Sequence, residues 1–375
     1  MLAVGVGWRI YALTNSAFDL GLVGLVQFVP MVLFTLVVGP LADRYDRRRI
    51  IGICQVVEGL AAAVLAVGTV RDCLGRDGIY AAVAVIGAAR AFESPTMAAL
   101  LPGLVPRALL ERASAGSASA NQTAQIIGPA LGGVLYALGP AIVFAVAATL
   151  FLAAATLVTS VHGAHAAPTR ATITLRSFFA GITFVWRNPL ILGSVSLDLF
   201  AVLFGGVTAL LPIFARDILD TGPWALGLLR SAPAIGALTM SVYLAHRPLQ
   251  TPIGLTMFGA VIMFGLATIV FALSKNFGLS LLSLLVLGAS DVVSVVIRFS
   301  LVQLRTQPEM RGRVSAVNAL FIGTSNQLGE FESGVTAALF GAVPAALLGG
   351  IATIAVAALW MRLFPQLTAL RSLEA

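Results

Sequence analysis

Residues 18–40, FDLGLVGLVQFVPMVLFTLVVGP, and residues 50–70, IIGICQVVEGLAAAVLAVGTV, flank the short basic stretch 41–49, LADRYDRRR. Each flank exceeds the run of about 18 mostly apolar residues that marks a candidate membrane span. Similar runs recur along all 375 residues, of which 59% are hydrophobic and only 10% charged. Soluble domains carry about 25% charged residues, so this composition cannot cover a water-exposed surface. We therefore predict an all-α polytopic membrane protein and exclude a soluble enzyme.

The alternation of apolar runs with polar breaks predicts twelve transmembrane helices. The longest break separates six helices from six, so we expect an N-terminal bundle over 1–160, a central cytoplasmic loop over 161–186 and a C-terminal bundle with a short cytoplasmic tail over 187–375. The first run is incomplete, because about 20 residues are needed to cross the hydrocarbon core. The predicted helices cover residues 1–13, 18–40, 50–70, 79–101, 112–138, 140–160, 187–213, 222–245, 252–273, 277–301, 313–341 and 344–364.

An internal repeat relates the two halves. Residues 24–30 share a Gly-Leu start and a Pro end with residues 227–233, and R-x-S-A-x-x-A at 112–118 recurs at 313–319. A nearly constant offset of this kind predicts two pseudo-symmetric six-helix bundles in parallel orientation. The same offset places the start of a complete first helix about 16 residues before Met1. We expect either a truncated or a misassigned N-terminus, with a natural half-helix as the alternative.

The basic residues predict the orientation of the chain in the membrane. If the 41–49 loop is cytoplasmic, fifteen of the 23 Lys and Arg residues lie on that side and five on the opposite side. This bias is the one that the positive-inside rule describes, and it also accounts for the net charge of +7. We therefore expect both termini in the cytoplasm of a bacterial-type cell with the protein in its inner membrane.

Several other classes of protein lack support in the sequence. The sequence contains no basic stripe with interleaved aromatic residues, so we do not expect nucleic-acid binding. The two cysteines, Cys54 and Cys73, are too few to form a disulfide framework, and they lack the spacing of a metal site. No nucleotide-binding loop and no helical metal motif occur, so we expect no cofactor and no metal.

The stretch 39–49, GPLADRYDRRR, turns from the second predicted helix into the third. It resembles the signature loop of the major facilitator superfamily, G-x-L-a-D-R-x-G-R-R/K, in its letters and in its place among twelve helices. Asp46 occupies the second glycine position, and Asp tolerates a turn with positive φ better than most residues. The resemblance implies the major facilitator fold and a gating role for the loop. The gating residues are then Gly39, Asp43, Arg44 and Arg47, whereas Arg48 and Arg49 are expected to be topology anchors.

Residues 128–133, GPALGG, in the fifth predicted helix resemble the core of the superfamily's antiporter motif, g-x-x-x-G-P-x-x-G-G. Ala124 replaces the leading glycine. The family associates this motif with exporters, which makes Gly128, Pro129, Gly132 and Gly133 candidate residues. The alternative is a seam of small residues that permits close helix packing.

Charged residues near the middle of predicted spans are the main candidates for function. Arg90 lies about 16 Å into the fourth predicted helix, close to the middle of a core about 30 Å thick. Glu93 lies on the same face, and a structural Arg90–Glu93 pair is the alternative to a functional role. Arg90 resembles the superfamily's fourth-helix arginine, which implies proton coupling. Asp198, about 15 Å into the seventh helix, is a second candidate for proton exchange or substrate binding.

Further polar residues within the spans receive weaker predictions. Asp291 and Arg298 share a face of the tenth predicted helix two turns apart, and we expect them to have a structural role by pairing with other helices near the cytoplasmic end. The uncharged candidates for lining a cavity are Gln27, Asn121 and Gln125. Interhelical hydrogen bonding is the expected role of Glu58, Glu330 and Glu332.

The function that follows is secondary active transport. Residues 90–95, RAFESP, and 311–318, RGRVSAVN, resemble the branch of the superfamily that includes enterobactin exporters. The resemblance implies proton-coupled efflux of a small amphipathic compound, drug-like or siderophore-like, by a monomer whose partners are its substrate, protons and the lipid bilayer. An importer of the same fold and a non-transporting receptor or scaffold remain as alternatives.

Overall fold

The computed structural model describes residues 1–161, 182–247 and 252–372. The side chains of residues 35–44, of Arg107 and of several residues between 308 and 320 lie outside this description, although their helices do not. Every regular element in the described residues is helical, which confirms the predicted all-α class.

By contacts between Cα atoms, the chain divides into two compact units. The first consists of Met1–Asn15, Leu22–Thr172 and Gly222–Gly227, and the second of Ser16–Gly21, Ile173–Thr221 and Leu228–Ala375. The two units are described separately below.

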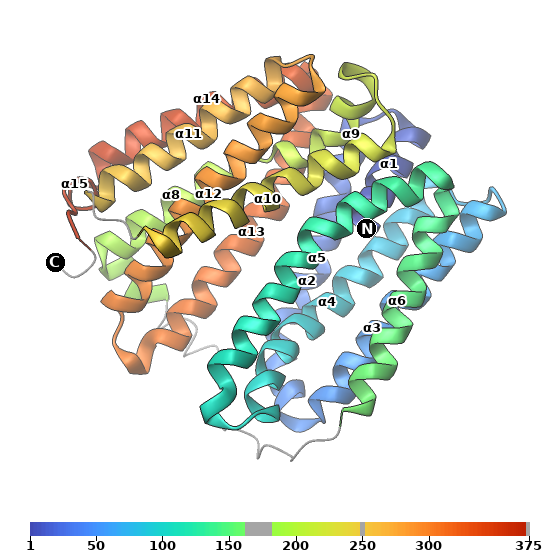
Figure 1. Cartoon of the computed structure of the whole chain (residues 1–375), viewed down its shortest axis with the longest axis horizontal. Helices are drawn as coiled ribbons and strands as arrows, with labels where there is room; N and C mark the ends of the chain where they lie inside the picture. Colours follow the sequence, from blue (N-terminus) through green and yellow to red (C-terminus); the bar gives the residue numbers. More distant parts are fainter. Residues whose placement is uncertain (162–181, 248–251, 373–375) are drawn as a thin grey trace. The chain divides into compact units, whose positions relative to one another are not determined.

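Six helices account for most of the described residues of the first unit, and Figure 1 draws them in blue to green; the start of α2, up to Gly21, belongs to the second unit. Within it α3 packs against α4 and α6, while α1 packs against α4, α5 and α6. The bounds are α1 (Leu2–Thr14), α2 (Ala17–Arg44), α3 (Arg47–Val70), α4 (Arg76–Leu104), α5 (Leu110–Leu138) and α6 (Pro140–Ser160).

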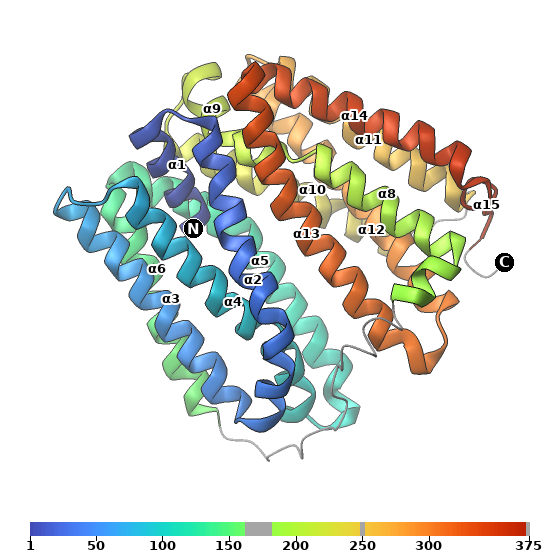
Figure 2. The ribbon, with the colours of Figure 1, turned by 180° about the vertical axis from the view of Figure 1, so that it is seen from behind.

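The second unit contains the remaining described helices, except that the start of α10, up to Gly227, belongs to the first unit. In it α11 packs against α12 and α14, and α8 packs against α12, α13 and α14; Figure 2 shows α8, α13 and α14 from behind. The bounds are α8 (Pro189–Phe204), α9 (Leu211–Ile213), α10 (Pro223–His246), α11 (Ile253–Leu273), α12 (Phe277–Arg305), α13 (Pro308–Phe340), α14 (Ala342–Leu363) and α15 (Pro365–Thr368).

Short polar side chains set several helix starts. The Asp46 carboxylate accepts a hydrogen bond from the backbone N–H of Arg48 at 3.0 Å and caps α3, so the residue that departs from the family's loop pattern has a local role. Asn188 and Asn276 cap α8 and α12 in the same way, accepting from Ile191 N and Leu279 N. The breaks predicted between helices therefore fall where a side chain accepts a hydrogen bond from a backbone N–H at the start of a helix.

Small residues bring helices together inside each unit. On α4, a Cβ added to Gly87 would lie 3.0 Å from the Cα of Gln27 on α2. On α11, a Cβ at Gly265 would lie 2.8 Å from the carbonyl oxygen of Gly350 on α14, and a Cβ at Gly350 would lie equally close to the Gly265 oxygen. Close backbone approach at small residues is the usual way in which membrane helices gain packing energy.

The seventh predicted helix, 187–213, is interrupted, and the prediction of a single continuous helix is wrong. Helix α8 ends at Phe204, and Gly205–Gly206 lead into a 3₁₀ turn over Val207–Leu210, the short α9 and a π-helical turn over Phe214–Ile218. Two consecutive glycines weaken a helix, and Pro212 removes a backbone donor just beyond them. The interruption lies in the interior of a 30-residue apolar segment, Pro189–Ile218.

Eight helical segments in the described residues are long and apolar enough to cross a membrane, judged by length and composition. Helix α1 is apolar but has only 13 residues. Helices α4, α5 and α13 fall outside this set although they have 29, 29 and 33 residues, because they contain several of the polar candidates.

Candidate functional site

The first charged cluster joins α3 and α4. The Arg90 Nε lies 3.5 Å from the Glu58 Oε1, with 49% of the arginine side chain exposed but only 1% of the glutamate side chain. A buried carboxylate needs compensation, because the interior solvates charge poorly. Arg90 therefore places positive charge beside this buried carboxylate, while its own side chain still reaches the surface of the described chain.

Glu93 has a different partner from the one that its spacing suggested. Its Oε1 accepts a hydrogen bond from Gln55 Nε2 on α3 at 3.1 Å. Arg90 and Glu93 share a helix face, but the ion pair recorded for Arg90 is with Glu58. Glu58, for which the sequence suggested only interhelical hydrogen bonding, thus has the central position in the cluster. Within the described part of the chain, Glu58 Oε1 has no hydrogen-bond partner of good geometry.

The basic end of the 39–49 stretch binds helix carbonyls. Arg47 Nη1 donates a 2.8 Å hydrogen bond to the Ala99 carbonyl oxygen near the C-terminal end of α4. Arg48 Nη1 donates to the Val161 carbonyl oxygen, directly after α6. Both sites suit cations, because helix C-termini carry partial negative charge. The side chains of the other gating candidates, Gly39, Asp43 and Arg44, lie outside the described residues.

The second charged cluster lies in the other unit. Arg298 Nη1 on α12 pairs with Asp198 Oδ2 on α8, and the two side chains are 2% and 6% exposed. The sequence placed Asp291 and Arg298 on one face of α12, but it did not identify Asp198 as the partner of the arginine. Asp291 lies two turns from Arg298 and lines a small pocket that Asp198 also lines.

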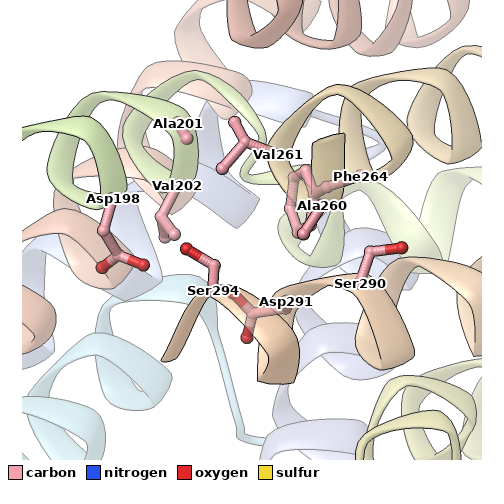
Figure 3. A pocket seen from close by; sticks show the side chains of 9 residues that line it. All are labelled: Asp198, Ala201, Val202, Ala260, Val261, Phe264, Ser290, Asp291 and Ser294. Atoms are coloured by element: carbon pink, nitrogen blue, oxygen red, sulfur yellow. The ribbon is translucent and has the colours of Figure 1, made fainter. Parts of the chain in front are cut away.

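This pocket is formed by three helices, as Figure 3 shows. The cavity volume is about 10 Å³, which is close to the volume that one water molecule needs. Helix α11 contributes only apolar side chains, whereas α8 and α12 contribute the polar ones. The lining residues are Asp198, Ala201, Val202, Ala260, Val261, Phe264, Ser290, Asp291 and Ser294.

A third ion pair was not predicted. Arg230 Nη2 on α10 lies 3.8 Å from Glu330 Oε1 on α13, and both side chains are about a quarter exposed, at 23% and 25%. The signal in the sequence was Arg230, the single charged Arg, Lys, Asp or Glu of α10. Its partner could not be selected, because α13 carries several charged residues.

The uncharged candidates are dispersed. Gln27 is partly buried on α2 beside Gly87. Gln125 Nε2 donates to Asn121 Oδ1 at 3.3 Å along the exposed face of α5. In the motif at 128–133, Gly132 and Gly133 are buried whereas Gly128 and Pro129 are partly buried, and a Cβ at Gly132 would lie 2.8 Å from the Met1 Cα. This close contact is what a packing seam requires.

Comparisons with known proteins define the class. A family model described as the Major Facilitator Superfamily matches residues 1–330. The chain is 29% identical over 387 residues to the enterobactin exporter EntS of Citrobacter koseri, covering 99% of this chain and 89% of that protein. It is 28% identical over 387 residues to EntS of Escherichia coli O1:K1, again covering 99% of this chain and 89% of that protein.

Solved structures show the same fold at low identity. The nucleoside transporter NupG superposes with a TM-score of 0.69 at 15% identity, covering 97% of this chain and 94% of that chain. The D-xylose-proton symporter superposes with a TM-score of 0.65 at 15% identity, covering 98% and 97%.

Apolar spans, charged pairs between helices and this fold define an integral membrane transporter rather than an enzyme. The chain belongs to the major facilitator superfamily. The resemblance found in the sequence is therefore confirmed, together with the fold class.

Proposed function

We propose that this transporter exports a small amphipathic compound, drug-like or siderophore-like, in exchange for protons by alternating access. Two observations support export: the curated relatives are named enterobactin exporters, and residues 128–133 resemble the antiporter motif. The siderophore-like class follows from the names of those relatives. The drug-like class follows from the resemblance of the motif.

The observation that carries proton coupling is the Glu58–Arg90 pair. The carboxylate of Glu58, at 1% exposure, has a guanidinium 3.5 Å away that favours its ionised form. If Arg90 turns toward substrate or solvent, the uncompensated carboxylate takes up a proton. The proton and the Arg90 guanidinium are then alternative partners of Glu58, so that movement of Arg90 is coupled to proton binding, which is the exchange that an antiporter needs. Glu93 and Asp198 are the remaining candidates for the proton-carrying group.

The rest of the chain supplies the frame for this exchange. In the proposal, an N-terminal bundle over 1–160 and a C-terminal bundle over 187–375 rock about a central cavity, with Gln27, Asn121 and Gln125 as lining residues. The loop with Gly39, Asp43, Arg44 and Arg47 gates the movement, and both termini face the cytoplasm of a bacterial cell. The transporter acts as a monomer in the inner membrane.

A substrate-panel assay in everted membrane vesicles tests the proposal. We expect uptake into the vesicles for at least one siderophore-like or cationic amphipathic compound, and its loss when a protonophore is added. Arg90→Ala and Asp198→Asn are the informative variants, and Lys275→Ala, which removes an exposed charge from a loop, is the matched control. Uptake that persists in both informative variants contradicts the roles assigned to these residues.

The same assay separates the two other functions. Accumulation of the compound in intact cells, with no movement into everted vesicles, identifies an importer. Binding of the compound without movement in either preparation identifies a receptor or scaffold. The motif at 128–133 disfavours the first, and the buried charges on several helices disfavour the second.

A further inference from the structure

The pocket between α8, α11 and α12 contains more negative than positive charge. Asp198 forms an ion pair with Arg298, and Asp291, which lines the same pocket, interacts electrostatically with that same arginine, so two carboxylates share one guanidinium. Inside an apolar bundle, an uncompensated carboxylate requires a proton or a cation. The apolar wall from α11 supplies neither.

A second, independent feature points to a ligand. The Ser294 side chain lines the pocket and its residue is only 2% exposed, yet its hydroxyl oxygen has no hydrogen-bond partner among the described residues. A buried hydroxyl without a partner is costly, since burial removes its hydrogen bonds to water. Ser290 adds a further hydroxyl to the lining. The polar groups are thus oxygen atoms, which are the ligands that hard cations prefer.

The broken helix next to the pocket adds to its preference for a cation. Ala201 and Val202 line the pocket from the last turn of α8, which ends at Phe204. The carbonyl groups at a helix C-terminus carry partial negative charge, and interrupted helices of this kind can bind ions inside membrane transporters. The Ala201 carbonyl already accepts bonds from Gly205 N at 2.9 Å and Thr353 Oγ1 at 3.1 Å, so the field of the helix end is fixed in place.

From these observations we infer that the pocket binds one small monovalent cation, with Na⁺ as the probe. Asp291 supplies the negative charge that exceeds the single positive charge of Arg298, while Ser294 and Asp198 supply further oxygen ligands. A divalent or transition metal fits less well, because the described residues contain no group of three or more His, Cys, Asp or Glu side chains that could hold one. A pocket that admits about one water also requires the ion to lose most of its hydration.

Binding of ²²Na⁺ to the purified full chain in detergent tests the inference, with choline chloride holding the ionic strength constant. We expect saturable binding of about one ion per chain, weakened at least about tenfold by Asp291→Asn because a charged ligand is lost. Ser294→Ala should weaken it about three- to tenfold, and it removes no recorded hydrogen bond within the protein. The matched controls are Ser283→Ala on the same helix and the exposed Asp77→Asn, both with unchanged binding.

Absence of saturable ²²Na⁺ binding overturns the inference, as does equal binding in Asp291→Asn and Ser294→Ala. A monodisperse elution profile of Ser294→Ala shows that a loss of binding is not a loss of fold. The inference uses the proposed function only in taking the chain as a transporter. If vesicles show proton-driven export but the purified chain binds no Na⁺, only the cation site fails, whereas Na⁺ binding without export leaves the cation site standing and removes the proposed function.

Discussion

Asp198 on α8 and Arg298 on α12 form an ion pair that is almost completely removed from solvent, with side-chain exposures of 6% and 2%. The pair joins the interrupted helix to a neighbour, in the same unit as the core cluster of Leu197, Ile297 and Leu301. In such surroundings the loss of one partner leaves a buried charge that water cannot compensate.

Asp198→Asn should therefore be strongly destabilising. We expect a cost of about 3–5 kcal/mol, measured as a lower thermal midpoint or faster loss of monodisperse protein in detergent. The matched control is Asp217→Asn, which removes an exposed partner of Arg216 and should cost less than about 1 kcal/mol. Equal stability of Asp198→Asn and wild type would falsify the structural role of the pair.

The double variant Asp198→Leu/Arg298→Leu removes both charges together. Because replacing a buried pair by apolar residues is often close to neutral, we expect it to be more stable than Asp198→Asn alone. The comparison uses the same thermal assay. A double variant less stable than the single one contradicts the view that the unpaired arginine causes the loss.

Arg47 should stabilise the junction between α3 and α4. Arg47→Ala removes its hydrogen bond to the Ala99 carbonyl, and we expect a loss of about 1 kcal/mol, because the arginine is only partly buried. Thermal unfolding in detergent measures it, with Arg49→Ala at an exposed neighbouring position as the control. A larger effect of Arg49→Ala than of Arg47→Ala contradicts the contact.

The contact between Gly265 and Gly350 predicts that a side chain larger than that of glycine at position 265 of α11 destabilises the protein. Gly265→Val places methyl groups where the α14 backbone lies, so we expect at least about 1–3 kcal/mol of destabilisation and a lower yield of folded protein. Gly259→Ala on the same helix meets nothing within 4 Å and should be neutral or slightly stabilising. Similar yields of the two variants argue against close packing of α11 and α14.

The helices could be predicted largely from the sequence, whereas the pairs between them could not. Apolar runs and capping residues are local, so the start of α3 at Arg47 and of α12 at Phe277 lie within a few residues of prediction. The interruption after Phe204 was missed, because the Gly205–Gly206 signal was outweighed by the apolar character of the whole segment.

The partners of the buried charges depend on how helices are rotated against one another. Spacing along α4 places Glu93 on the face of Arg90, but only the packing of α3 against α4 brings Glu58 to within 3.5 Å of the arginine. Likewise, Asp198 and Arg298 are 100 positions apart, and no local pattern joins them. The candidate residues were thus accessible from sequence as isolated charges, and their pairing required the structure.

The most direct test of the account compares two kinds of transport by Glu58→Gln, which removes the exchangeable proton but keeps the shape of the side chain. In vesicles that contain the purified protein, exchange of labelled for unlabelled substrate needs no net proton movement, whereas export driven by an imposed pH gradient does. We predict that gradient-driven export falls at least about tenfold while exchange stays within about twofold of wild type. Gradient-driven export at the wild-type rate in Glu58→Gln would contradict the claim that this carboxylate couples protons to transport.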